Sequence, residues 1–371
     1  MPSYGNCIKW TNRRIPAKET DCHMKILEIN TEKTWRGGER QTLYTIKGLK
    51  EAGINVELLC LRGYPLFEKS KVLNIPIHGV KNQNEAIKFL SQNGKTFDII
   101  HAQTAKGQSI AVLSKVFHKR PVIYTRRVDF VPKGNLSRFK YKLTDRVIAI
   151  SNPIREILEK FGVNNTEVIP SIAERKDLNI ERGETLKHEL GLTKQKIVAT
   201  IAALVPHKDP MTMVETIKEL SGLRNDFVFL HFGDGPLKKE VMEKLRNYNL
   251  EDNYKLMGFY EDVEDFFSIF DVFVMSSQEE GLGSSVLDAF FYMVPVVSTE
   301  AGGLKETVFN RGLLCPVKDP ECLAKSINAI IENKELRENL INKAYNDVNN
   351  MYSLKRNIEG YIRIFNSIIQ N

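Results

Sequence analysis

Residues 276–291 form the stretch of this chain that is best suited to chemistry. Their sequence, SSQEEGLGSSVLDAFF, follows an apolar strand predicted over 271–275 and runs into a predicted helix. A turn of this kind leaves backbone N–H groups unpaired at the helix start, where an anion is favoured. Gly281 and Gly283 let the backbone approach a ligand closely, because they carry no Cβ. With Glu280 beside them, these residues predict a phosphate site next to a carboxylate.

A regular alternation of strands and helices leads up to this stretch. The chain starts with a strand over 25–30, a helix over 39–52 closed by Gly53, and a strand over 55–60. Such a βαβ unit predicts parallel strands and a right-handed crossover. The pattern continues with strands over 98–101, 121–125, 147–150 and 168–170, and helices over 84–92, 108–117 and 154–161.

A second series of elements follows residues 171–195, a polar linker with a helix over 184–190. Its strands are predicted over 197–203, 227–232, 254–257, 271–275 and 295–298, and its helices over 211–221, 237–248, 263–270, 285–292, 320–333, 336–351 and 354–369. Two doubly wound domains in tandem place a ligand cleft between two sets of strand carboxyl ends. The stretch over 276–291 should therefore face that cleft.

The composition is that of a soluble globular chain long enough for two domains. Of the 371 residues, 42% are hydrophobic and 27% charged, and no apolar run reaches the length of a membrane span. Residues 1–23 lack the apolar centre of a secretory signal, which favours a disordered extension or an upstream start with Met24 as the working initiator. Scattered cysteines without metal-ligand spacing predict reduced thiols in a cytoplasmic protein: Cys7, Cys22, Cys60, Cys315 and Cys322.

Glu280 and Asp288 are separated by seven residues, and other short motifs occur in a characteristic order along the chain. The chain resembles a retaining glycosyltransferase of the GT-B fold, family 4, whose E-x7-E signature follows the same strand; Asp288 replaces the usual second Glu. The other landmarks of the resemblance are Gly37-Gly38, Ser151-Asn152, Lys208, Gly233-Asp234-Gly235-Pro236, Gly258-Phe259, Gly302-Gly303 and Glu306. Within the family, WRGGERQ and YTRRVDF look most like transferases that build lipopolysaccharide cores or similar surface glycans.

The resemblance covers nearly all of the chain from Met24 onward. It implies two Rossmann-like domains that bind different substrates. Residues 24–172 would form the acceptor-side domain, and residues 173–353 the domain that binds the nucleotide sugar. The closing helix, 354–369, would pack back on the first domain, as in the family; the alternative is an ordinary helix of the second domain.

The resemblance also implies how the leaving diphosphate is stabilised. No Asp-x-Asp motif or His/Asp cluster suggests a metal, and we expect no cofactor besides the nucleotide-sugar substrate, a UDP, GDP or ADP sugar. A cation and a helix start can stabilise the developing charge instead. Lys208 would be that cation, and the amides of Gly283, Ser284 and Ser285 the helix start. The family usually has an Arg five residues before this Lys, where this chain has Ala203; His207 and Arg36 are candidates for a second cation.

The two acids of the signature would hold different parts of the donor. Glu280 would hold hydroxyls of the sugar and Asp288 those of the ribose, since a carboxylate can accept two hydrogen bonds from a vicinal diol. For Asp288 a capping box starting at Ser285 is the alternative. For Glu306 it is a first-turn helix acid. The full predicted donor-binding set is Gly37, Gly38, His207, Gly233, Gly281, Leu282, Gly283, Ser284, Ser285, Asp288, Gly302, Gly303 and Glu306.

On the acceptor side the chain departs from the family. The family often has a His just after the strand that corresponds to 121–125, whereas this chain reads Arg126-Arg127-Val128-Asp129. We expect Asp129 or Arg127 to orient the acceptor and count Asp129, with Glu280 and Lys208, as catalytic. The predicted acceptor-side residues are Arg126, Arg127 and His101. His101 stands at the end of its strand, and a hydrogen-bonded structural His is the alternative for it.

The charge distribution suggests what the first domain faces. Residues 24–170 carry 25 Lys and Arg against 13 Asp and Glu, whereas residues 171–371 carry 24 against 31. Between Lys106 and Arg146 eleven basic residues are interleaved with aromatic ones, which suits an anionic membrane surface or a phosphorylated lipid acceptor. Nucleic acid is not expected, because no recognised binding module accompanies the patch. The predicted location is the cytoplasm, with peripheral attachment to the inner face of the membrane as an option.

Three other functions compete with the transferase. A nicotinamide dehydrogenase would need G-x-G-x-x-G after the first strand, which residues 35–40 do not supply. A sugar-nucleotide epimerase shares the GT-B fold but lacks this E-x7-D arrangement. An inactive scaffold of a surface-glycan complex is suggested by Ala203 and the missing His, but Glu280 and Lys208 remain. The sequence therefore predicts sugar transfer to a glycan or a lipid-linked acceptor.

Overall fold

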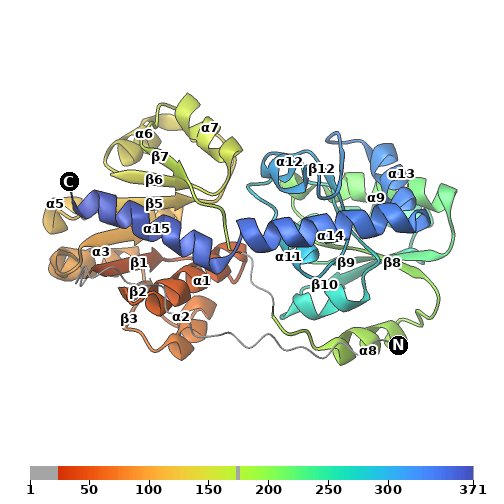
Figure 1. Cartoon of the computed structure of the whole chain (residues 1–371), viewed down its shortest axis with the longest axis horizontal. Helices are drawn as coiled ribbons and strands as arrows, with labels where there is room; N and C mark the ends of the chain where they lie inside the picture. Colours follow the sequence, from red (N-terminus) through yellow and green to blue (C-terminus); the bar gives the residue numbers. More distant parts are fainter. Residues whose placement is uncertain (1–23, 173–175, 371) are drawn as a thin grey trace.

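Two α/β domains lie side by side in the computed structural model, which describes residues 24–172 and 176–370 (Figure 1). The predicted extension over 1–23 lies outside the described residues. Each domain is built on one parallel sheet.

The first domain has a seven-stranded sheet in the order β3-β2-β1-β4-β5-β6-β7. Its strands are β1 (Lys25–Asn30), β2 (Asn55–Leu61), β3 (Ile77–Val80), β4 (Ile99–Ala102), β5 (Val122–Arg126), β6 (Arg146–Ala149) and β7 (Thr166–Val168). Its helices are α1 (Gly37–Glu51), α2 (Pro65–Ser70), α3 (Gln83–Asn93), α4 (Ala105–Leu113), α5 (Lys115–His118), α6 (Gly134–Lys142) and α7 (Asn152–Lys160), with short 3₁₀ turns at Lys71–Leu73 and Gly94–Thr96.

The second domain has a six-stranded sheet in the order β10-β9-β8-β11-β12-β13. Its strands are β8 (Lys196–Ile201), β9 (Phe227–Phe232), β10 (Tyr254–Gly258), β11 (Val272–Met275), β12 (Val296–Thr299) and β13 (Leu313–Cys315). Its helical elements are α8 (Ile180–Glu189), η3 (Pro206–Lys208), α9 (Pro210–Leu223), α10 (Lys238–Asn247), η4 (Val263–Ile269), α11 (Ser284–Phe291), α12 (Gly303–Val308), α13 (Pro320–Glu332) and α14 (Lys334–Met351).

The strand order explains where a ligand site must lie. In each sheet one pair of neighbours is not consecutive in the chain, β1 with β4 and β8 with β11, so the chain winds outward in both directions from that point. Ligands of open α/β sheets bind beyond the strand carboxyl ends at such a switch. The loops after β1 and β4, and those after β8 and β11, lie at these switch points, and the loop after β5 lies next to that after β4.

The last helix, α15 (Leu354–Ile369), lies along the first domain, whereas α14 lies along the second (Figure 1). Its apolar stripe, which includes Ile358 and Phe365, packs in one core with residues of α1 and the first sheet. A Cβ on Gly48 of α1 would lie only 2.4 Å from Ile358, so the glycine allows the two helices to approach. The hydroxyl groups of Tyr361 and Thr125 are 3.1 Å apart and link α15 to β5. The chain thus crosses from one domain back to the other.

Several short elements differ from the sequence prediction. The helix expected over 108–117 is two helices that meet at Ser114, whose hydroxyl donates to the Ile110 carbonyl at 2.7 Å. The segment over 263–270 is 3₁₀ rather than α-helical. Five further elements, which are short or strongly polar, were not predicted: α2, α6, α12, β3 and β13.

The prediction for the cysteines also differs from the structure. Cys315 and Cys322 form a disulfide between β13 and α13, so the prediction that all thiols are reduced is wrong for this pair. The Cys60 thiol is free and buried in the first domain, and burial raises its pKa to about 12. Among residues 24–172 and 176–370, no helix combines the length and apolar content that a membrane span requires.

Candidate active site

The loop after β11 rests on the turn after β8. The Ser276 hydroxyl donates to the carbonyls of Lys208 and Asp209 at 3.1 and 2.9 Å. The backbone N–H of Gln278 donates to the carbonyl of His207 at 2.9 Å. Strand β11 pairs directly with β8, so these two loops leave neighbouring positions of the same sheet edge. Residues 70 positions apart in the sequence are thereby held together.

Lys208 and Glu280 meet as an ion pair at this edge. Their side chains are 20% and 15% exposed, so the pair is sheltered but can still be reached from solvent. A cation beside a carboxylate can contact a phosphate with one partner and a sugar hydroxyl with the other. The two residues predicted to hold the diphosphate and the sugar therefore lie side by side.

Helix α11 begins directly beside this pair. Its N-cap residue is Gly283, at a φ of 81° that glycine adopts without strain, and no side chain caps the first turn. Gly37, at the start of α1, faces it: a Cβ there would lie 3.1 Å from the Ser284 hydroxyl oxygen. The starts of two helices from different domains thus lie against one another. Both bring backbone N–H groups that favour an anion.

The first domain also contributes a carboxylate. A Cβ on Gly302 would lie 2.6 Å from the Asp129 carboxylate and 2.5 Å from the Glu280 carbonyl, so all three residues lie together. A Cβ on Gly281 would lie 2.5 Å from the Arg127 carbonyl. Burial raises the pKa of Asp129, and the negative charge of Glu280 raises it further. The three residues predicted to be catalytic, Glu280, Lys208 and Asp129, therefore gather at one boundary.

Further contacts fasten the domains beside the site. Glu306, in the first turn of α12, accepts hydrogen bonds at 3.0 Å from both the backbone N–H and the side-chain amide of Asn152, at the start of α7. The Ser151 hydroxyl donates to the Gly281 carbonyl at 2.9 Å. Glu306 is thus a first-turn acid that caps a helix of the other domain, and its contact with a donor stays a prediction.

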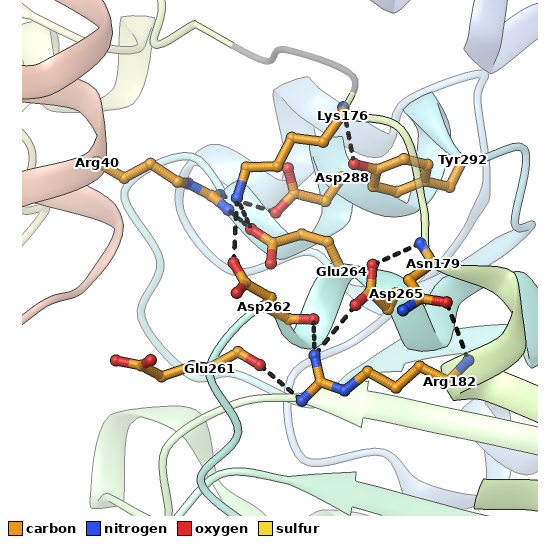
Figure 2. A network of polar contacts seen from close by, with 10 residues as sticks. All are labelled: Arg40, Lys176, Asn179, Arg182, Glu261, Asp262, Glu264, Asp265, Asp288 and Tyr292. Atoms are coloured by element: carbon orange, nitrogen blue, oxygen red, sulfur yellow. Dashed lines mark hydrogen bonds and ion pairs between the residues drawn. The ribbon is translucent and has the colours of Figure 1, made fainter. Parts of the chain in front are cut away.

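Asp288 is held by a residue that the sequence analysis did not single out. Arg40 of α1 donates to the Asp288 carboxylate at 2.8 Å across the domain boundary (Figure 2). The capping-box alternative for Asp288 is wrong, because α11 starts after Gly283 and its first turn has no side-chain cap. Arg40 lies in the WRGGERQ turn, of which Gly37 and Gly38 were predicted to bind the donor. Its partner Asp288 is 248 positions away in the sequence.

The two acceptor-side arginines are tied to their own domain. Arg126 is buried and donates to the Tyr141 hydroxyl at 2.7 Å and to the Phe130 carbonyl. Arg127 donates to the Gln103 side chain at 2.6 Å and to its carbonyl at 3.0 Å. Arg126 is therefore a structural residue rather than an acceptor contact, whereas Arg127 is half-buried next to Gly281.

His101 does not reach the site. Its side chain is fully buried, with Nδ1 2.9 Å from a Glu28 carboxylate oxygen and Nε2 2.8 Å from the Thr125 hydroxyl. The structural alternative describes it correctly, and its prediction as an acceptor contact is wrong for this arrangement.

The remaining predicted residues differ in their surroundings. Close backbone contact requires glycine at two positions: a Cβ would lie 2.0 Å from the Ala202 carbonyl at Gly233 and 2.1 Å from the Gly281 carbonyl at Gly303. Leu282 is buried, whereas His207 and Arg36, the candidates for a second cation, are exposed. Gly38 and Ser285 lie in the first turns of α1 and α11. No group of three or more His, Cys, Asp or Glu suited to a metal is found in the described part of the chain.

Comparison with known proteins identifies related domains and folds. The family model "Glycosyltransferase Family 4" matches residues 35–172, and the model "Glycosyl transferases group 1" matches residues 183–347. The fold resembles that of HepE from Anabaena, solved with UDP and glucose, at a TM-score of 0.81, with 19% identity and 93% and 100% of the two chains covered. It also resembles TarM from S. aureus at a TM-score of 0.77, with 14% identity and 92% and 100% covered.

Curated relatives are similar over most of the chain. A UDP-Gal:alpha-D-GlcNAc-diphosphoundecaprenol alpha-1,3-galactosyltransferase from Escherichia coli is 26% identical and covers 90% of this chain and 95% of its own. The N-acetyl-alpha-D-glucosaminyl L-malate synthase of Bacillus anthracis is 25% identical, covering 64% of each chain. The protein thus has the two-domain GT-B fold. Its first domain is a glycosyltransferase family 4 domain and its second a glycosyl transferases group 1 domain, and the chain is a glycosyltransferase.

Proposed function

We propose that this chain transfers a sugar from a nucleotide sugar to a glycan or lipid-linked acceptor, with retention of the anomeric configuration. The reaction would serve the synthesis of lipopolysaccharide or another cell-surface polysaccharide. The observation that carries the proposal is the Lys208–Glu280 pair beside the uncapped start of α11, with Asp129 facing it from the other domain. Its cation and helix start suit a diphosphate, and its carboxylates suit hydroxyl groups.

On the donor side, the diphosphate would lie between Lys208 and the first amides of α11. As the bond from the sugar C1 to the diphosphate oxygen breaks, that oxygen gains negative charge, which the ammonium group and the amides stabilise without a metal. Glu280 would leave its ion pair in part to accept hydrogen bonds from sugar hydroxyls. Asp288, one turn further along α11, would accept from the ribose.

On the acceptor side, a hydroxyl oxygen would form the new bond to C1 from the face that the diphosphate leaves. Its proton would pass to the departing phosphate oxygen, so the sugar keeps its configuration and the charges balance. Asp129 would orient this hydroxyl, since it lies beside Glu280 across the boundary. Burial raises the pKa of Asp129, so its carboxylate is a stronger base and hydrogen-bond acceptor than an exposed carboxylate, which suits an acceptor hydroxyl.

The class of acceptor is supported by relatives and by the basic first domain. The Escherichia coli relative is named for an acceptor linked to diphosphoundecaprenol, and a Rhizobium meliloti relative, 25% identical over 46% of this chain, for lipopolysaccharide core biosynthesis. Lys and Arg outnumber Asp and Glu in residues 24–170 by 25 to 13. The negative charge of a diphosphate-linked lipid would be attracted by this excess of positive charge.

We also propose that the outer face of the first domain contacts an anionic membrane. Large apolar side chains on and between α5 and α6 are more than half exposed, next to lysines and arginines: Val116, Phe117, Phe130, Leu136 and Phe139. Aromatic side chains with basic neighbours bind the interface of an anionic bilayer. In liposome flotation the protein should float with phosphatidylglycerol vesicles and not with phosphatidylcholine vesicles. Equal recovery with both would remove the membrane proposal.

The decisive test is a donor and acceptor screen. UDP, GDP and ADP sugars are incubated with the protein and candidate lipid-linked glycans, and products are identified by mass spectrometry, with the anomeric configuration read by NMR. We expect one donor nucleotide to raise the melting temperature and one sugar to be added with retention. A scaffold would give no product, and an epimerase would change the donor sugar without an acceptor.

A further inference from the structure

A cluster of charged side chains joins the two domains next to the candidate donor site (Figure 2). Arg40 extends from α1 of the first domain, and its two terminal nitrogens donate to different carboxylates of the second. One donates to Asp288 of α11 at 2.8 Å, the other to Glu264 of η4 at 2.6 Å. Nζ of Lys176, in the linker between the domains, lies 3.5 Å from the same Glu264 oxygen. Arg40, Glu264 and Asp288 form a central triad, and the side chain of each is less than a fifth exposed.

We propose that Arg40 is a positioning residue of the donor site, which neutralises two adjacent carboxylates and aims that of Asp288 at the ligand. This rests on the proposed function, in which Asp288 accepts hydrogen bonds from the ribose. Arg40 uses only Oδ2 of the Asp288 carboxylate, and no described residue is hydrogen-bonded to Oδ1. The rigid fork of a guanidinium fixes two carboxylates in a defined geometry, whereas an ammonium on a flexible stem defines their geometry less well. Oδ2 of Asp288 is thereby held in place, and Oδ1 is left for a ligand hydroxyl.

The charges around Asp288 show why it needs this partner. The charged or titratable groups that face it are Arg40 from α1, Glu264 from η4, Lys176 from the linker side and Tyr292 from its own helix. Burial raises the pKa of Asp288, the guanidinium of Arg40 lowers it, and the negative charge of Glu264 raises it again. Without Arg40 the carboxyl group would keep the burial and the like charge but lose its nearest counter-charge. It would then take up a proton closer to neutral pH.

The pKa values of the other two members of the triad, Arg40 and Glu264, shift in the directions that favour their charged forms. Burial works against the charge of Arg40, but its pKa is raised overall because Asp288, Tyr44 and Glu264 favour the charged form. Burial raises the pKa of Glu264, but Arg40 and Lys176 lower it by more, so the net shift is downward. Arg40 and Glu264 therefore stay ionised, and Asp288 is the member whose charge depends on the triad.

The test compares each nucleotide with its 2′-deoxy counterpart by isothermal titration calorimetry. The ratio of the two dissociation constants isolates the ribose hydroxyl, because titration of the phosphates cancels. With UDP, GDP or ADP, whichever binds, wild type should prefer the ribonucleotide by about 10- to 100-fold at both pH values of about 6.5 and about 8.5. Arg40→Met should lose this preference at the lower pH and regain it at the higher one. Adding Glu264→Gln to Arg40→Met should restore part of the preference at the lower pH, because the like charge is gone.

Other results would overturn the proposal. A preference in Arg40→Met that equals wild type at both pH values, or that is reduced equally at both, shows that Arg40 does not act through the charge of Asp288. Should Arg40→Met not fold, Arg40→Lys carries the same test, with an intermediate preference expected at the lower pH and a wild-type preference at the higher one. A wild-type ratio near one rejects the ribose role of Asp288 and with it this proposal, whereas failure of all three nucleotides to bind rejects the proposed function itself.

Discussion

Replacing Gly281 by alanine tests whether the site is assembled by close contact between the domains. Gly281 lies between Glu280 and the start of α11, and the new Cβ would stand 2.5 Å from the Arg127 carbonyl oxygen of the first domain. Carbon and oxygen atoms in contact prefer a separation of about 3.5 Å, so the backbones must separate by about 1 Å. The backbone conformation itself is not at issue, because Gly281 does not have a positive φ.

This separation of the two domains would change the position of Glu280 relative to the first domain. A shift of about 1 Å in a positioned group can cost on the order of 100-fold in rate. We therefore expect kcat/KM of Gly281→Ala to fall by about 30- to 100-fold with the donor found by the screen. The free energy of unfolding should fall by only about 1 kcal/mol, at the low end for an overpacking substitution, because the strain can be relieved by movement between the domains.

Gly222 supplies a matched control on the same domain. It is an exposed residue of α9, and a Cβ there would meet no atom within 4 Å. Gly222→Ala should keep wild-type activity and gain up to about 1 kcal/mol of stability from the better helix propensity of alanine. The assay is steady-state release of nucleotide, with thermal unfolding measured in parallel. Wild-type kcat/KM in Gly281→Ala would refute the reasoning, because the domains would then not need to approach at this point.

Three further predictions follow from individual contacts. Lys208→Ala and Glu280→Ala should each lower kcat by about 100-fold or more while the melting temperature stays near that of wild type; a fully active variant in a transfer assay would refute its role. His231, buried between Tyr254 and the Ala202 carbonyl, has its pKa lowered to about 4. Because the unfolded chain then binds the proton more readily, the free energy of unfolding should fall by about 3 kcal/mol as the pH drops from about 6.5 to about 4. Chemical denaturation of His231→Gln should show a smaller pH dependence, and an unchanged one would contradict this. In liposome flotation, Phe139→Ser should weaken recovery with anionic vesicles, and unaltered recovery would count against the proposed membrane face.

The apolar strands made the two sheets predictable. Strands such as β1 and β9 are short runs of buried aliphatic and aromatic residues that alternate with helices, and the order of such units implies parallel sheets. The glycine-rich turn after β11 could likewise be placed at a strand carboxyl end. The polar helix α6 and the three-residue strand β13 were not predicted, because their formation depends on neighbours that are distant in the sequence.

The candidate site was predictable only in part, for the same physical reason. Lys208 and Glu280 follow adjacent strands, and the motifs of the family resemblance drew attention to both. The Arg40–Asp288 contact spans 248 positions and both domains, so no local pattern reveals it. His101 has the sequence position of a site residue, but Glu28 on the neighbouring strand β1 holds it in the core.

The measurement that tests sugar transfer at the Lys208–Glu280 pair most directly is product analysis of wild type and Lys208→Met with the same donor and acceptor. We predict that wild type adds one sugar in the anomeric configuration of the donor, and that Lys208→Met, although folded, adds none above background. An inverted product, or transfer by Lys208→Met at the wild-type rate, would contradict the proposed site and its chemistry.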